Sequence, residues 1–308
     1  MKQQLVSIAL CTYNGSKHLY QQMDSLVNQN YANIQIVVVD DCSKDGTWDI
    51  LIGFKDKYSF VDIYKNEVNL GYIKNFERAI SLCKGDFICL SDQDDIWDKH
   101  KIEIMVSSFN KDSALIYHNS ELIDEDGNLL PHSLSKRIGF TEGNNKHYNL
   151  LLNNCIAGHA IMFRKSLLNY IFPFQQNIPH DHWIAYTAAK IGSIQYLLQS
   201  LVKYRQHQKS VTTTTHFNNV ISKKQRKQNI AEERIRNLNA LRNCRNNSQK
   251  DIILIDKLVK SLSSLLSNHH FSISLFLLYL KNRKKLFGLY HKSFFSSVIM
   301  IFKERKIK

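Results

Sequence analysis

Three carboxylates lie within four residues in the segment Leu90-Ser91-Asp92-Gln93-Asp94-Asp95-Ile96-Trp97. They follow a short apolar run at residues 86–90, which is typical of a buried strand. Repulsion between neighbouring carboxylates raises their pKa values, and a divalent cation relieves it. Such cations bind one or two carboxylates together with substrate phosphates, so the segment favours a metal–diphosphate site. The alternative is a polar loop in which Asp94 or Asp95 caps the next helix.

Polar residues also follow three earlier apolar runs. Residues 6–11, 34–39 and 61–64 are typical of buried strands, and apolar residues at helical spacing lie between them. This βαβαβαβ order predicts a parallel sheet, in which ligands bind beyond the carboxyl ends of the strands. Polar clusters follow all four runs: Thr12-Tyr13-Asn14, Asp40-Asp41, Asn69-Leu70-Gly71 and residues 92–95. GxGxxG does not follow the first run and GxxxxGK[ST] is absent, which argues against a dinucleotide-binding Rossmann domain and a P-loop.

Two later segments carry polar groups beside predicted elements. Asp181 opens a predicted helix that ends at Gly192, and it is either the cap of that helix or a general base. Arg205 and His207 lie at the end of a predicted strand, where they are either solvated or in contact with a diphosphate. We expect strands at residues 155–163, 194–198 and 201–205, and a polar loop near the site at residues 131–150.

The charge is unevenly distributed along the 308 residues. Residues 1–215 contain 21 basic and 22 acidic side chains, whereas residues 216–308 contain 20 basic and 5 acidic ones. We therefore expect two parts, a near-neutral one at 1–215 and a basic, mainly helical one at 216–308. Basic clusters beside short apolar helices suit docking on an anionic membrane surface. The alternative is a bundle packed on the first part of the chain with a solvated basic face, and no nucleic-acid-binding module is recognisable.

The order of these motifs resembles glycosyltransferase family 2. The matching segments are Thr-Tyr-Asn-Gly, Asp-Asp-x-Ser-x-Asp-Gly-Thr, Asn-x-Gly, Asp-x-Asp, His-Asp-x-Trp and Tyr-Arg-x-His, over about residues 5–211. The form Ser-Asp-Gln-Asp-Asp-Ile-Trp is similar to a bacterial rhamnosyltransferase-like branch that builds surface polysaccharides. The resemblance implies that residues 1–215 are a catalytic domain with an α/β GT-A fold, a Rossmann-like, mostly parallel nucleotide-binding sheet flanked by helices. Where the family commonly has Glu-Asp, this chain has His180-Asp181.

The resemblance also implies roles for matching residues. Asp40 or Asp41 would hydrogen-bond the base, and Asp92 would meet the ribose. Asp94 and His207 would bind Mg²⁺ or Mn²⁺. The residues expected to contact the nucleotide sugar are Thr12, Tyr13, Asn14, Asp40, Asp41, Asn69, Gly71, Asp92, Gln93 and Arg205.

The implied reaction is an inverting sugar transfer with Asp181 as the base that deprotonates the acceptor hydroxyl. The expected donor is a uridine- or deoxythymidine-diphosphate sugar, with dTDP-L-rhamnose suggested by the branch. The expected acceptor is a glycan, lipid-linked, at the inner face of the cytoplasmic membrane. Two alternatives stay open. One is a nucleotidyltransferase, which needs a Gly-rich loop bearing Arg and Lys after the first strand. The other is a non-catalytic membrane scaffold, and the presence of Asp92, Asp94 and Asp181 argues against it.

Overall fold

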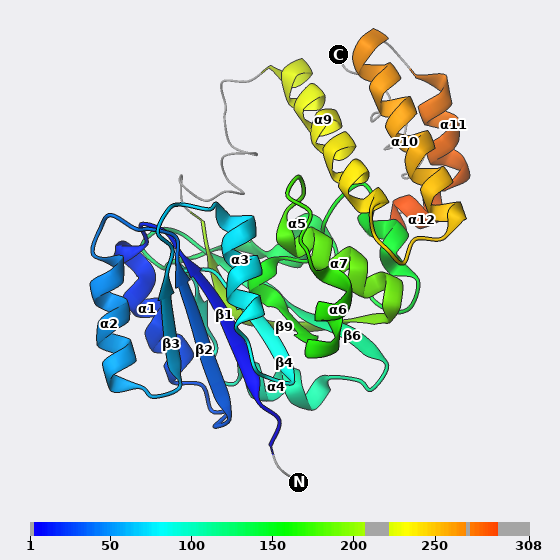
Figure 1. The fold of residues 1–308 in the computed structure, drawn as a ribbon. Coiled ribbons are helices and arrows are strands. Elements are labelled where there is room, and N and C mark those ends of the chain that lie inside the picture. The colour runs from blue at the N-terminus through cyan, green and yellow to red at the C-terminus, as the bar shows by residue number, and fades with distance from the viewer. Residues whose placement is uncertain (1–2, 207–221, 269–271, 289–308) are drawn as a thin grey trace.

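The computed structural model describes residues 3–206, 222–268 and 272–288 (Figure 1). Its first part confirms the predicted order of strands and helices. The strands β1 (Val6–Thr12), β2 (Ile34–Asp40), β3 (Val61–Lys65) and β4 (Phe87–Ser91) lie parallel to one another. They are connected through α1 (Ser16–Val27), α2 (Thr47–Lys57) and α3 (Tyr72–Ser81). The four strand ends with their polar clusters therefore lie on one edge of the sheet.

The second part of the sheet is mixed, which the sequence did not predict. The strand order is β3-β2-β1-β4-β8-β6-β9-β5, and β7 pairs with β6. Strand β8 is antiparallel to both β4 and β6, whereas β9 is parallel to β6. These strands are β5 (Ile96–Trp97), β6 (Ser113–Ile123), β7 (Leu129–Ser133), β8 (Ile161–Arg164) and β9 (Ser193–Arg205).

Three local expectations are corrected by the structure. Residues 155–163 are not one strand, because the short helix η2 (Gly158–Ala160) precedes β8. Residues 131–150 contain β7, α5 (Leu134–Ile138) and η1 (Lys146–Leu150) rather than a plain loop. The two last short strands are one long strand, β9. The remaining helices of this part are α4 (Lys101–Ser108), η3 (Lys165–Leu167), α6 (Leu168–Ile171) and α7 (His180–Ile191).

Alternation along the strands explains how helices cover both faces of the sheet. Ile8 and Leu10 of β1 belong to the core cluster that contains residues of α1, α2 and α4. Ala9, between them, belongs to the cluster that contains residues of α3 and α7. Successive side chains of a strand point to opposite faces, so β1 is buried on both sides. This burial fixes the register and hence the position of every strand end.

The helical C-terminal region packs on the α7 side of the sheet (Figure 1). It consists of α9 (Lys223–Arg242), α10 (Gln249–Asn268), α11 (Ile273–Lys281) and α12 (Arg283–Leu286). Its buried residues, such as Leu238 and Leu258, share a core cluster with Trp183 of α7. The described part of this region therefore docks on the domain that contains the sheet. The proposed domain boundary at residue 215 lies outside the described residues.

One buried carboxylate anchors this docking. Asp251 of α10 is 1% exposed and accepts from Lys190 Nζ at 2.7 Å, with His147 Nε2 at 3.2 Å. Burial by itself raises the pKa of Asp251, but hydrogen bonds from Lys190 and Ser248 outweigh it and lower the pKa below its usual value. The carboxylate thus joins α10 to α7 and η1.

We expect Asp251→Asn to lower the free energy of unfolding by about 3 kcal/mol at pH 7, because it leaves Lys190 buried without its anionic partner. A lowered pKa stabilises the fold above the unfolded carboxyl pKa of about 4, so the difference from wild type shrinks as the pH falls below that value. Urea unfolding at pH 7 and pH 3.5 measures it. The control is Asp256→Asn on the same helix, whose pair with Arg242 is about half exposed. An equal effect of the two substitutions would contradict the anchoring role.

Candidate active site

The loops after the first three strands are tied together by buried carboxylates. Asp40 is 0% exposed and accepts from Thr12 Oγ1 at 2.9 Å and from the backbone N–H of Ser43 at 3.0 Å. Asp41 accepts from the backbone N–H groups of Leu70 at 2.8 Å and Gly71 at 2.9 Å. The predicted clusters therefore meet at one edge. Loop donors of the protein bind both carboxylates, and contact of Asp40 or Asp41 with a nucleotide base stays a prediction.

Gly71 and Asn69 complete the third loop. Gly71 has φ +81°, a conformation that glycine adopts without strain, and it is the residue before α3. Asn69 Oδ1 accepts from the Gly71 N–H at 3.2 Å, while its Nδ2 donates to the Asp41 carbonyl at 3.3 Å. Both residues shape the edge of the sheet, and contact with a nucleotide stays a prediction for them.

The first and fourth loops are joined by a side-chain amide. Gln93 Oε1 accepts from the Tyr13 N–H at 2.8 Å, and its Nε2 donates to the Tyr13 carbonyl at 3.2 Å. Asn14, with φ 47°, accepts from the backbone N–H of Lys44 at 2.9 Å. The Tyr13 side chain is 48% exposed, so its ring is available to stack on a ligand. Gln93 acts here as a brace between loops.

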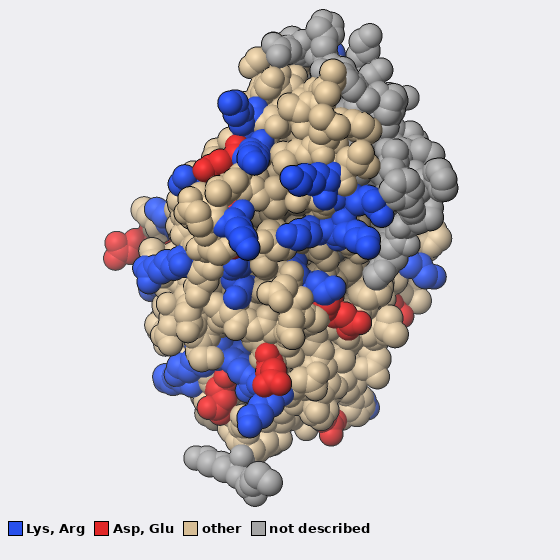
Figure 2. Space-filling model, turned by 90° about the vertical axis from the view of Figure 1, so that its right-hand side faces the viewer, with Lys and Arg blue, Asp and Glu red and all other residues tan. Residues whose placement is uncertain are grey.

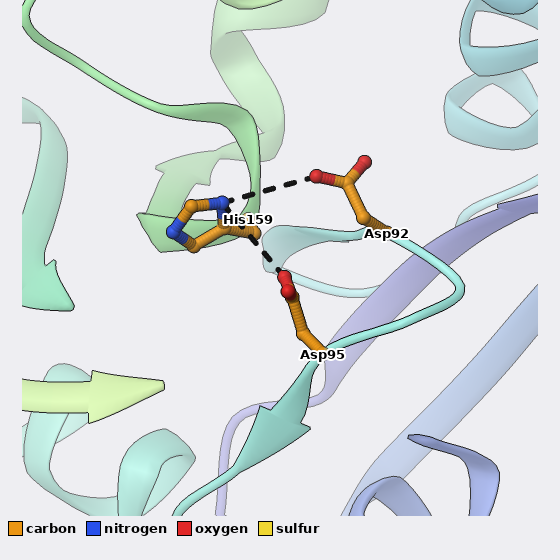
Figure 3. A group of neighbouring side chains, drawn as sticks. All are labelled: Asp92, Asp95 and His159. Atoms are coloured by element: carbon orange, nitrogen blue, oxygen red, sulfur yellow. Dashed lines mark ion pairs between the residues drawn. The ribbon is translucent and has the colours of Figure 1, made fainter. Parts of the chain in front are cut away.

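The acidic loop contributes two carboxylates to a cluster with a histidine (Figure 3). His159 Nδ1 lies 3.8 Å from Asp92 Oδ2 and 3.8 Å from Asp95 Oδ2. Asp95 is 0% exposed, and among the described residues its Oδ2 has no hydrogen-bond partner. Burial raises its pKa well above the usual value, with Asp94 and Asp92 adding to the effect. An ionised Asp95 therefore needs a positive charge at this point.

These atoms fit a divalent cation. Ligands of an octahedral ion with bonds of about 2.1 Å lie about 3 to 4 Å apart, and the two separations of 3.8 Å fall in that range. Burial lowers the pKa of His159, so its ring is neutral near pH 7. Ser120 Oγ lies 2.9 Å from His159 Nε2 and orients the ring with Nδ1 toward the carboxylates.

The cluster differs from the predicted metal ligands. The structure gathers Asp95 and His159 with Asp92, whereas Asp94 is not part of this group. His207 lies outside the described residues, so its role stays a prediction. Sequence reasoning missed His159 because it precedes β8, and only the antiparallel pairing of β8 with β4 brings it to the acidic loop.

Arg205 holds the acidic loop from inside the protein. It is 2% exposed, and its Nε donates to the Asp94 carbonyl at 2.8 Å. Its Nη1 donates to the Glu125 carbonyl at 2.8 Å and its Nη2 to Gln21 Oε1 at 2.9 Å. The guanidinium is thus bonded to protein oxygens, and the expected contact of Arg205 with a diphosphate stays a prediction. Its backbone N–H also donates to Asp95 Oδ1 at 3.1 Å, which aims the other oxygen at His159.

The first turn of α7 places Asp181 close to this cluster. A Cβ atom on Gly158, the neighbour of His159, would lie 3.6 Å from Asp181 Cβ and 3.1 Å from His180 Nε2. His180 stacks on Phe76 with a centroid distance of 4.0 Å. Burial raises the pKa of Asp181 to about 7, with Asp92 adding to the effect. A carboxylate with this pKa has the basicity that suits a general base at neutral pH.

A second residue that sequence reasoning missed is Lys101. It is 0% exposed, and its Nζ donates to the His159 carbonyl at 2.6 Å. The same Nζ lies 3.2 Å from the centroid of the Trp97 ring. Burial lowers the pKa of Lys101 to about 7. The sequence predicts no more for it than the start of a helix, and no local signal distinguishes it from a surface lysine.

Comparison with known families shows which kind of protein this chain is. The sequence model described as glycosyl transferase family 2 matches residues 7–172, more than half of the chain. The chain belongs to glycosyltransferase family 2. As a family 2 member it is an enzyme, and the matched part contains the strand-end loops, the acidic loop and His159.

Relatives of this family 2 chain carry glycosyltransferase names. An uncharacterized glycosyltransferase of Rickettsia typhi is 28% identical over 215 residues, 68% of this chain and 66% of that protein. One of Rickettsia bellii is 28% identical over 210 residues, 66% of this chain but 30% of that protein. The chain thus spans less than two thirds of these relatives. Escherichia coli WfgD, named UDP-Glc:alpha-D-GlcNAc-diphosphoundecaprenol beta-1,3-glucosyltransferase, is 29% identical over 218 residues, 69% of this chain and 81% of WfgD.

Solved structures show that the family 2 chain has the GT-A fold. Staphylococcus aureus TarS 1-349 in complex with UDP-GlcNAc superposes with a TM-score of 0.58 at 17% identity, covering 98% of this chain and 81% of that chain. The mannosyltransferase PcManGT from Pyrobaculum calidifontis, in complex with GDP-Man and Mn²⁺, gives 0.53 at 14% identity, covering 98% and 84%. At these identities the likeness concerns the fold.

Proposed function

We propose that this chain is an inverting glycosyltransferase that moves a sugar from a nucleoside-diphosphate donor to a glycan acceptor, with Asp181 as general base. The observation that carries the proposal is the placement of Asp181 next to Gly158, which precedes His159 of the Asp92–Asp95–His159 cluster. A proton acceptor and a group suited to a diphosphate-bound cation thus lie at one edge of the sheet.

The residues divide the work of a single displacement. When bound, Mg²⁺ or Mn²⁺ supplies a Lewis acid that neutralises the departing diphosphate. Asp181 accepts the proton of the attacking hydroxyl, and attack opposite the leaving group inverts the anomeric centre. Tyr13 and the loops braced by Asp40, Asp41 and Gln93 hold the nucleotide. Holding donor and acceptor in line supplies much of the rate acceleration.

The substrates are proposed from the relatives. The name of WfgD supports a uridine-diphosphate hexose and an acceptor linked through diphosphate to undecaprenol. The complex of TarS with UDP-GlcNAc supports a uridine nucleotide. A deoxythymidine-diphosphate sugar such as dTDP-L-rhamnose is the second donor to test. A lipid-linked acceptor places the enzyme in synthesis of bacterial surface polysaccharide.

Such an acceptor lies at the inner face of the cytoplasmic membrane, and we propose that the basic helical region contacts that surface. Ile273 and Leu277 of α11 are 62% and 56% exposed one turn apart, and Lys281 follows on the same helix. Figure 2 views the molecule from the right-hand side of Figure 1. Over the upper part of this face, Lys and Arg side chains outnumber those of Asp and Glu. None of the described helices combines the length and apolar character required to span a bilayer.

A transfer assay tests the proposed reaction. The full chain is incubated with a GlcNAc-diphospholipid, Mn²⁺ and either UDP-glucose, UDP-GlcNAc or dTDP-L-rhamnose, and the product linkage is read by NMR. We expect transfer from one donor, with the anomeric configuration opposite to that of the donor. Retention of configuration would contradict the single displacement assigned to Asp181.

A further inference from the structure

Lys101 departs from two common preferences of lysine residues in folded proteins. It is the first residue of α4, where the helix dipole disfavours a positive charge, and it is fully buried, which lysine almost never is. Violations of local preference in a well-packed protein are expected mainly at functional positions. Neither the family membership nor the proposed roles of the general base and the metal ligands assign a function to Lys101.

The contacts of Lys101 lead directly to the Asp92–Asp95–His159 cluster. Its Nζ donates to the backbone carbonyl of His159, at 2.6 Å, within the short helix η2. The His159 ring is held separately, by Ser120 at 2.9 Å from Nε2 and by Tyr204, on which it stacks with a centroid distance of 4.3 Å. Lys101 thus fixes the backbone from which this ring projects, while Ser120 and Tyr204 fix the rotation of the ring.

We propose that Lys101 is a positioning residue that holds His159 Nδ1 at the spacing at which it shares one divalent cation with Asp92 and Asp95. This inference rests on the proposed metal role of the cluster. The Trp97 ring, whose centroid lies 3.2 Å from Nζ, keeps the ammonium in place without adding another carboxylate to the site.

The sign of the effect on metal binding separates positioning from simple electrostatics. Removing a positive charge beside a cation site strengthens cation binding through Coulomb's law. Losing the contact that places a ligand weakens it, by about 10- to 100-fold where supporting contacts of metal ligands have been removed. Positioning therefore predicts weaker binding in Lys101→Met, although the site becomes more negative.

The experiment titrates Mn²⁺ into the full chain by calorimetry for wild type, Lys101→Met and Lys101→Gln. Met removes both the charge and the hydrogen bond, whereas Gln removes the charge and keeps an N–H donor toward the carbonyl of His159. Lys99→Met, an exposed lysine two residues away, controls for loss of one positive charge. We expect Mn²⁺ affinity to fall about 10-fold or more in Lys101→Met, to recover partly in Lys101→Gln and to stay unchanged in Lys99→Met. Equal or tighter binding by Lys101→Met would overturn the proposal.

A second measurement distinguishes failure of this inference from failure of the proposed metal role. In metal-free protein with labelled histidine, the His159 ring signals are assigned by their loss in His159→Gln. We expect Lys101→Met to shift these signals and to leave those of His147, which lies beside Asp251, in place. If wild type binds no Mn²⁺, the metal role fails and the ring signals alone decide on Lys101. Unchanged His159 signals in folded Lys101→Met or Lys101→Gln would overturn the positioning role.

Discussion

Replacing Asp181 with Asn is expected to lower kcat by about 1,000-fold, because the acceptor hydroxyl then loses its proton acceptor. In the wild type, only ionised Asp181 is a base, and burial raises its pKa to about 7. The rate should therefore rise with pH up to about 7 and level off above it. The Asn variant should keep its fold, its nucleotide binding and a residual rate without this limb. Initial rates between pH 5.5 and 9 measure both effects.

The same substitution has a consequence for stability. A carboxyl whose pKa is raised on folding destabilises the folded state as the pH rises from its unfolded pKa, about 4, through its folded pKa. Asp181→Asn removes this cost, so it should unfold at a higher temperature than wild type at pH 8 and at the same temperature near pH 4. Asp49→Asn, an exposed acid in the first turn of α2, is the control and should change neither kcat nor stability by much. A variant that kept wild-type activity would remove Asp181 from the mechanism.

The second large effect concerns the metal ligands. His159→Phe keeps an aromatic ring that stacks on Tyr204 but removes the nitrogen that faces Asp92 and Asp95. We expect it to weaken Mn²⁺ binding by about 100-fold or more and to lower kcat/KM by a similar factor. Asp95→Asn should act in the same direction, because Asp95 Oδ2 has no other partner among the described residues. Calorimetry with Mn²⁺ and initial rates at one Mn²⁺ concentration near the wild-type Kd measure the two quantities.

His100→Phe provides the matched control, since His100 is a partly exposed histidine paired with Glu103 on α4. It should leave Mn²⁺ binding unchanged. If His159→Phe bound Mn²⁺ as tightly as wild type, the cluster would not be the metal site. The ligands expected from the sequence alone, Asp94 and His207, would then lead.

The sequence predicts the carboxyl edge of the sheet well, because the patterns that indicate it lie within short segments of the chain. Four apolar runs fix parallel strands, and the polar residues after each run must then meet at the carboxyl edge. The hydrogen-bond partners of these polar residues were less predictable. The carboxylates of Asp40 and Asp41 face backbone donors of neighbouring loops, and this depends on loop conformations that no short pattern encodes.

The missed residues share one physical cause. His159 reaches the acidic loop through antiparallel pairing of β8 with β4, a contact between segments about 70 residues apart. Lys101 resembles a surface lysine until α4 packs against the sheet and buries it. The apolar stripe of α10 suits a membrane surface or a protein core equally well by periodicity, and the structure shows that Leu258 and Leu262 pack in the core.

Nucleotide binding by the wild-type chain tests the combined site most directly. Calorimetry with UDP and dTDP, each in Mn²⁺ and in EDTA, asks whether the strand-end loops and the Asp92–Asp95–His159 cluster form one metal-dependent nucleoside-diphosphate site. We expect one of these nucleotides to bind in Mn²⁺ and to lose most of its affinity in EDTA. Equal binding in EDTA, or no binding of either nucleotide to the folded chain in Mn²⁺, would contradict the site described above.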